Sequence, residues 1–205
     1  MAGSSSKKAM PNYVLASVAV SLSGLVNGFD TGSIGAISHM RQFEATMGPL
    51  PAVLLGITVS MIMLTGAPPS VFAGHLADRY GRLRVILPGA VLFALGALLQ
   101  GTARGLGQFV AGRALGGFGQ GVFLANAAVY ITEIAPYRSR GRLVALPQFM
   151  AAAGVCLGYF TCYGTVALPG GLAWRLPYVV QGAVAAGLAL ACGLLPESPR
   201  WLARK

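Results

Sequence analysis

The stretch GFDTGSIGA, residues Gly28–Ala36, places a single aspartate, Asp30, inside a segment that is otherwise uncharged. The preceding charged residue is Lys8 and the following one is Arg41. A carboxylate near the middle of a membrane span costs about 2.5–3.5 kcal/mol on the insertion scale. We therefore expect Asp30 to have a partner, a bound proton or a functional role.

The composition around this stretch is that of a membrane protein. Hydrophobic residues make up 55% of the 205-residue chain and charged residues only 10%, whereas a soluble domain carries about 25% charged residues. The 29 glycines fit membrane helices that pack closely. The lipid bilayer is thus the expected partner of most of the surface.

The net charge of +10 is typical of nucleic-acid-binding proteins as well as of some membrane proteins. Here the basic residues stand in small groups between apolar spans, and no basic domain exists to hold a duplex. An excess of Lys and Arg on cytoplasmic loops explains the sign, so we expect no nucleic acid as a partner.

Long gaps between charged residues predict the spans. A membrane helix needs about 20 apolar residues, and the gaps predict an all-α membrane protein with six transmembrane helices near residues 13–36, 51–75, 84–103, 107–131, 143–166 and 175–195. The alternative, a large soluble helical protein, requires polar faces on its helices. The second, third and sixth spans have almost none.

The loops predict the orientation and the domain limits. Eleven Lys and Arg residues fall on one side of the spans and three on the other, so both termini are expected in the cytoplasm. Residues 1–11 read as a disordered cytoplasmic tail, residues 12–197 as the six-helix bundle, and residues 198–205 as the start of a cytoplasmic linker.

Three charged turns recur on the cytoplasmic side. GHLADRYGRLR contains Asp78 and Arg82, and its glycines suit a tight turn. The other two turns supply Glu133 with Arg140, and Glu197 with Arg200, the last two as a further charge pair. Carboxylates and guanidinium groups at helix ends can form ion pairs that hold or release those ends. The alternative is a set of generic positive-inside loops.

The sequence contains no pattern for catalysis or for a metal. Cys156, Cys162 and Cys192 lie in apolar runs without metal-ligand spacing. The glycines after Gly112 do not form a dinucleotide fingerprint, because Val122 stands where the third glycine is required. We expect no enzyme, no cofactor and no metal site.

Six motifs in order carry a resemblance to a known family. They are GFDTGSIGA, GHLADRYGR, GRALGGFG, YITEIAPYRSRGR, WRLPY and PESPRWL. The chain resembles the N-terminal half of a sugar porter of the major facilitator superfamily, most closely the fungal sugar transporters.

The resemblance implies a fold and a function. The fold would be six helices arranged as two inverted three-helix repeats. The function would be transport of a sugar or polyol by alternating access, with a missing C-terminal six-helix half as partner, in the plasma membrane. A transporter-like sugar sensor and an inactive truncated product are the alternatives.

The same resemblance suggests roles for buried polar residues. Asp30 and Arg113 match the positions that couple proton movement in symporters, and facilitative relatives often lack the acid. A carboxylate beside a guanidinium is held ionised, and it takes up a proton more readily when the guanidinium withdraws. A static ion pair between spans one and four is the alternative. Gln148 and Asn27 are the candidate substrate-binding residues. The alternative is that such amides only serve the packing of helices.

Two packing expectations follow. Span one should lie against span four through Gly28, Gly32, Gly112 and Gly116, since glycines let helices approach closely. One face of the bundle should also be partly polar, because it would meet the missing half, and should include Asn27, Asn126 and Gln148. Asp78 should lack a partner that the missing half supplies.

Overall fold

The computed structural model describes residues 12–203 as a bundle of long helices without strands in that range. The predicted disordered tail, residues 1–11, lies outside the described residues. The helices are α1 (Asn12–Ser38), α2 (Arg41–Met47), α3 (Ala52–Tyr80), α4 (Arg82–Gly101), α5 (Leu106–Ile134), α6 (Arg140–Thr165), α7 (Leu172–Leu194) and α8 (Pro199–Leu202).

Six of the described helices are long and apolar enough to cross a membrane, which confirms the six predicted spans. The second of them, α3, contains Pro68 and Pro69 within the helix and continues five residues beyond its predicted end at residue 75, to Tyr80. A single residue, Gly81, then separates α3 from α4. Its φ of 111° explains the glycine, because a side chain is strained there.

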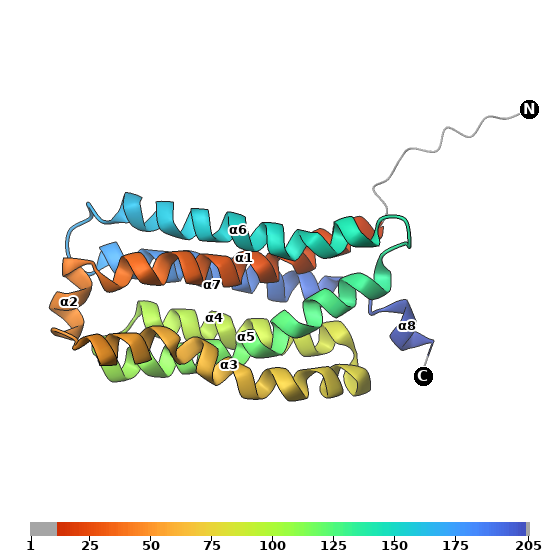
Figure 1. Ribbon diagram of the computed structural model, residues 1–205, viewed down its shortest axis with the longest axis horizontal. Coiled ribbons are helices and arrows are strands. Elements are labelled where there is room, and N and C mark those ends of the chain that lie inside the picture. The colour runs from red at the N-terminus through yellow and green to blue at the C-terminus, as the bar shows by residue number, and fades with distance from the viewer. Residues whose placement is uncertain (1–11, 204–205) are drawn as a thin grey trace, which may run out of the picture.

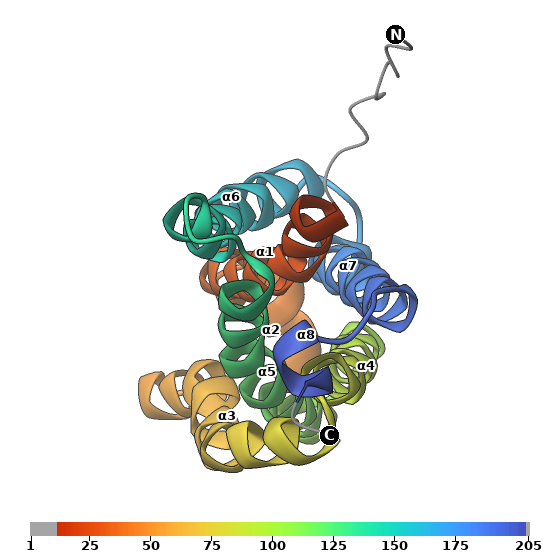
Figure 2. The same ribbon diagram turned by 90° about the vertical axis from the view of Figure 1, so that its right-hand side faces the viewer.

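The helices run roughly side by side (Figure 1). The short helix α2 closes one end of the bundle, and α8 lies at the opposite end, where α1 begins (Figure 1). Viewed along the bundle, α3 and α6 stand apart with α1 and α5 between them (Figure 2). These two outlying helices are also the least buried of the six spans.

The closest helix contact joins α1 to α6 and corrects the predicted packing. A methyl group added at Gly24, Gly28 or Gly32 would strike the α6 backbone, at Pro147, Ala151 and Val155 respectively. The expectation that Gly28 and Gly32 face α5 was therefore wrong. Glycine spacing predicts a close approach but does not say which helix approaches.

The other two glycines of that prediction also face a different helix. Gly112 on α5 lies against Gly96 and Gln100 of α4, and Gly116 lies beside Gln100 and Phe93 of the same helix. A second row on α5, Gly117 and Gly121, packs on α3.

These contacts reveal a repeated arrangement. The first helix of the triplet α1, α3, α4 packs on α6, and the first helix of the triplet α5, α6, α7 packs on α3. Each contact thus joins the first helix of one triplet to the second helix of the other. This exchange is the relation expected of two inverted three-helix repeats.

Candidate functional site

The interior of the bundle contains the predicted pair of Asp30 and Arg113. Asp30 on α1 is 3% exposed and Arg113 on α5 is 1% exposed. Two nitrogens of the guanidinium donate to the two carboxylate oxygens, Nη1 to Oδ1 and Nη2 to Oδ2, each over 3.2 Å. This bidentate geometry is the strongest form of a charge-assisted hydrogen bond.

Each member of the pair also has a neutral partner. Arg113 Nη2 donates to the carbonyl oxygen of Val59 over 3.1 Å, and Nη1 lies 3.5 Å from Gln100 Oε1. On the other side, Gln181 Nε2 donates to Asp30 Oδ1 over 2.9 Å. Groups from α1, α3, α4, α5 and α7 therefore meet at this point.

The sequence reasoning missed Gln100 and Gln181. Both are 1% exposed, and both lie in spans that were defined by their lack of charge. An amide carries no charge, and the spans were located by their charge-free runs, so these residues were not singled out. The available signal was a glutamine within an otherwise apolar run, since buried polar groups need hydrogen-bond partners.

This arrangement can accommodate a change of charge. If Asp30 accepts a proton, the attraction between its side chain and Arg113 weakens. The guanidinium then still has the Val59 carbonyl and Gln100 as acceptors. Because neither side chain would be left without a polar neighbour, the pair can loosen at lower cost than an isolated buried ion pair.

A cavity of about 440 Å³ lies between α1, α3 and α5, and its lining includes Asn27, which precedes Asp30 on α1 by three residues. Asn27, Gln120 and Ser70 supply its polar lining. Asn27 is half-buried and its Oδ1 accepts a hydrogen bond from Gln120 Nε2, while the Oε1 of Gln120 is buried and has no hydrogen-bond partner among residues 12–203. The carboxamides thus offer both donors and acceptors to a polyhydroxylated ligand.

Gln148 lies outside this cavity. It is exposed on α6, and its predecessor Pro147 packs against Gly24 of α1, so Gln148 lies at about the level of Gly24. Gln148 is thus exposed, as the expected polar face requires, whereas Asn27 is half-buried and bonded to Gln120 of α5. That this face meets a second half stays a prediction.

Asn126 does not belong to that face, and its assignment was wrong. It is 1% exposed, and its amide donates to Ala73 O of α3 over 3.3 Å and to Val122 O of its own helix over 2.9 Å. It ties α5 to α3. The sequence could not reveal this, because an asparagine in a span looks the same whether it faces a helix or a cavity.

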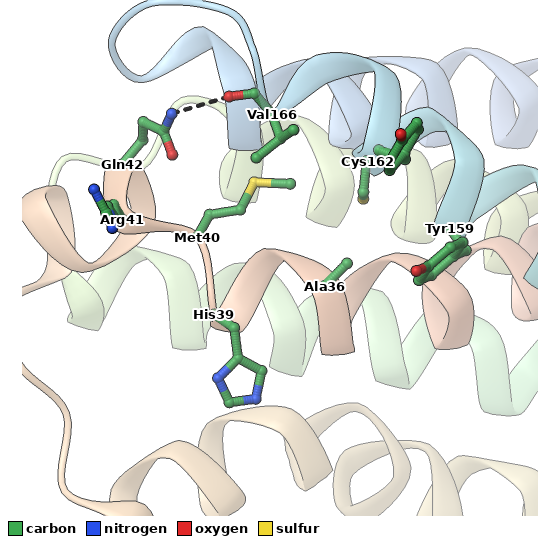
Figure 3. A pocket seen from close by; sticks show the side chains of 9 residues that line it. Ala36, His39, Met40, Arg41, Gln42, Tyr159, Cys162 and Val166 are labelled. Carbon is green, nitrogen blue, oxygen red and sulfur yellow. Dashed lines mark hydrogen bonds between the residues drawn. The ribbon is translucent and has the colours of Figure 1, made fainter.

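A second cavity, of about 480 Å³, lies at the α2 end between α1 and α6. Gln42 and His39 are both in its lining; Gln42 donates to Val166 O over 3.1 Å, and the His39 side chain points away from Val166 (Figure 3). Its lining also includes Tyr159 and Tyr163, which are both exposed. No predicted site residue lies there.

At the opposite end, Arg82 is the centre of a charged cluster. It lies 2.6 Å from Asp78 and 3.1 Å from Glu133, joining the start of α4 to the ends of α3 and α5. The side chain of Asp78 remains 58% exposed. A cavity of about 350 Å³ beside this cluster is also lined by Arg200 and Trp201.

Glu197 has a different partner from the one expected. No ion pair joins it to Arg200 in residues 12–203, so that predicted pair was wrong. Its carboxylate instead accepts hydrogen bonds from the backbone N–H groups of Leu83, over 3.3 Å, and Arg84, over 3.0 Å. These are unpaired donors of the first turn of α4, where a negative charge is favoured.

Arg140 is half-buried, and its Nε has no hydrogen-bond partner within the described range.

Comparison with known proteins assigns the chain to a family. The family model "Sugar (and other) transporter" matches residues 16–205. The Bacillus subtilis arabinose-proton symporter is 33% identical over 199 residues, which cover 93% of this chain and 42% of the relative. A fungal relative, the MFS-type transporter criB of Aspergillus cristatus, is 32% identical over 185 residues, covering 90% of this chain and 40% of that protein.

A solved structure agrees with the fold. The inward-open xylose transporter XylE from E. coli superposes with a TM-score of 0.80 at 26% identity, over 93% of this chain and 50% of that chain. This chain therefore spans about half the length, or less, of the relatives it matches. On the evidence of its six spans and these matches, it is a multi-pass membrane protein that belongs to the sugar transporter family.

Proposed function

We propose that this chain is the N-terminal half of a proton-coupled porter that carries a sugar or a polyol across the plasma membrane by alternating access. The end of the described bundle that carries α8 and the start of α1 would face the cytoplasm. The activity belongs to the assembly of this half with a C-terminal six-helix half.

The observation that carries proton coupling is the buried pair of Asp30 and Arg113 with its neutral partners. A static tether needs only the pair itself. The additional contacts of Arg113 with Val59 and Gln100 support a guanidinium that stays solvated when Asp30 is protonated. Asp30 would then gain a proton from one side and release it to the other once per cycle.

The substrate would bind in the cavity lined by Asn27 and Gln120. Asn27 and Gln120 offer amide donors and acceptors there, and Gln148 would contribute from α6 on the same side. The face formed by α3, α5, α1 and α6 would meet the second half, because α3 and α6 are the least buried spans.

The charged end would act as the gate. Its groups would hold the helix ends together in one state and release them in the other, and the exposed carboxylate of Asp78 would contact a helix end of the second half. The proposed network consists of Asp78, Arg82, Glu133, Arg140, Glu197 and Arg200.

The test is uptake of labelled sugars and polyols into proteoliposomes under an imposed inward proton gradient. The chain alone should show no uptake, since one half provides no alternating gate. The chain joined after Lys205 to the C-terminal half of a sugar porter should accumulate substrate, and dissipating the gradient should abolish accumulation. Binding without uptake by the joined protein would favour a sugar sensor instead.

A further inference from the structure

Gln181 on α7 is a buried amide that uses only one of its two polar atoms in hydrogen bonds. It is 1% exposed. Its Nε2 donates to Asp30 Oδ1 over 2.9 Å, whereas its Oε1 has no hydrogen-bond partner among the described residues. An unpaired acceptor in a membrane interior is costly, so its retention next to the acidic group calls for an explanation.

We propose that Gln181 is a positioning residue that serves both protonation states of Asp30. With the carboxylate ionised, the amide donates through Nε2, as observed. With the carboxyl protonated, the amide turns by half a rotation about its last side-chain bond and accepts through Oε1. This proposal rests on the proposed function, in which Asp30 binds a proton.

The exchange adds one proton to Asp30 and keeps the hydrogen bond between Asp30 and Gln181. A proton delivered by water forms an O–H bond on Asp30 Oδ1, and that oxygen becomes a donor. In the observed structure Gln181 Nε2 lies 2.9 Å from Asp30 Oδ1. After the rotation, Gln181 Oε1 occupies that place. The contact therefore persists with donor and acceptor reversed, and Arg113 keeps its charge.

An amide is the side chain suited to this exchange, because it is neutral and carries a donor and an acceptor of nearly equal size. A lysine could only donate, and an aliphatic residue could do neither.

Few other groups near Asp30 compete for the proton. The other titratable or charged groups from the packed helices are Arg113 of α5, Tyr178 of α7 and Cys162 of α6. From α3 and α4, the groups that reach the pair are neutral: the carbonyl of Val59 and the amide of Gln100.

The test is pH-difference infrared spectroscopy of the 205-residue chain in lipid nanodiscs. The band of the protonated Asp30 carboxyl is identified as the one that disappears in Asp30→Asn. In the wild type, a carboxamide C=O signal should change over the same pH range as that band, because the oxygen of the amide gains a hydrogen bond. The amide signal should be absent from Asp30→Asn.

Gln181→Met tests the assignment, since it keeps the length of the side chain and removes both polar atoms. The amide signal should be lost, and the Asp30 acid C=O band should shift to higher frequency because its O–H has lost an acceptor. The matched control is Asn126→Leu, which removes an equally buried amide of α5 whose hydrogen bonds go to Ala73 O and Val122 O, away from Asp30 and Arg113. It should leave the Asp30 acid band in place.

The outcomes are separable. If Asp30 titrates while no amide signal accompanies it, or if Gln181→Met leaves the acid band unshifted, Gln181 is a fixed donor and this inference is wrong. If no band is assignable to Asp30 at any pH, the proton-coupling proposal fails and takes this inference with it. The wild-type amide signal decides the matter even if Gln181→Met does not fold.

Discussion

Asp30 and Arg113 are 83 residues apart in the sequence, yet their side chains meet in two parallel contacts of 3.2 Å inside the bundle. The pair is the only point in the described spans where two opposite charges meet with less than 5% of either side chain exposed. It joins the first helix of one repeat to the first helix of the other, so its energetics should affect both the stability and the cycle of the molecule.

The pair predicts strong non-additivity in stability. Arg113→Leu leaves a buried carboxylate without its countercharge, and Asp30→Leu leaves a buried guanidinium, so each should lower the free energy of unfolding by about 3–5 kcal/mol. The double variant should be more stable than either single variant, because no unpaired charge remains. Equilibrium unfolding in mixed micelles, followed by tryptophan fluorescence, measures all three. Additive losses would show that the two charges do not interact.

The α1–α6 contact predicts opposite effects for one substitution at two glycines of the same helix. Gly28→Ala should cost about 1–3 kcal/mol, because the added methyl meets the backbone of Ala151. Gly35→Ala should be neutral or stabilising by up to about 1 kcal/mol, since nothing lies near that position and alanine favours the helix. The same unfolding assay applies. Equal effects at both positions would rule out the close α1–α6 packing described above.

Glu197 should stabilise the start of α4. Glu197→Ala removes the acceptor for the N–H groups of Leu83 and Arg84, at an expected cost of about 1 kcal/mol. Glu197→Gln should lose less, because it keeps an acceptor oxygen. Glu44→Ala is the matched control at the other end, where the side chain is exposed. The temperature of unfolding should fall only for the Glu197 variants, and a fall of equal size for Glu44→Ala would point to net charge instead.

Much of the fold could be predicted from the sequence because charges are excluded from membrane interiors. The charge-free runs therefore marked all six spans, and the two exceptions, Asp30 and Arg113, were expected to pair. The short helix α2 was missed because it lies in a loop, where hydropathy carries no signal. The cap formed by Glu197 was missed because a carboxylate beside Arg200 suggests an ion pair, whereas the backbone donors of α4 become available only in the fold.

The details of helix packing were less predictable. Gly28 and Gly112 both predict that another helix packs closely at their positions. Which helix this is depends on the rotation of each helix about its own axis. The same freedom explains why Asn126 was placed on the polar face when it binds α3. Neutral amides such as Gln181 were not singled out, because their importance follows from a neighbour on another helix.

The central claim is that Asp30 carries the coupled proton. Its most direct test is sugar uptake by the joined two-half protein in proteoliposomes, with and without an imposed proton gradient, in wild type and Asp30→Asn. Asn keeps the size of the side chain and cannot gain or lose the proton, so accumulation against the sugar gradient should be abolished. Exchange of labelled for unlabelled sugar should persist, because Asn27, Gln120 and Gln148 are unchanged. If Asp30→Asn still accumulates sugar against its gradient when the proton gradient is imposed, Asp30 is a structural tether and the claim is wrong.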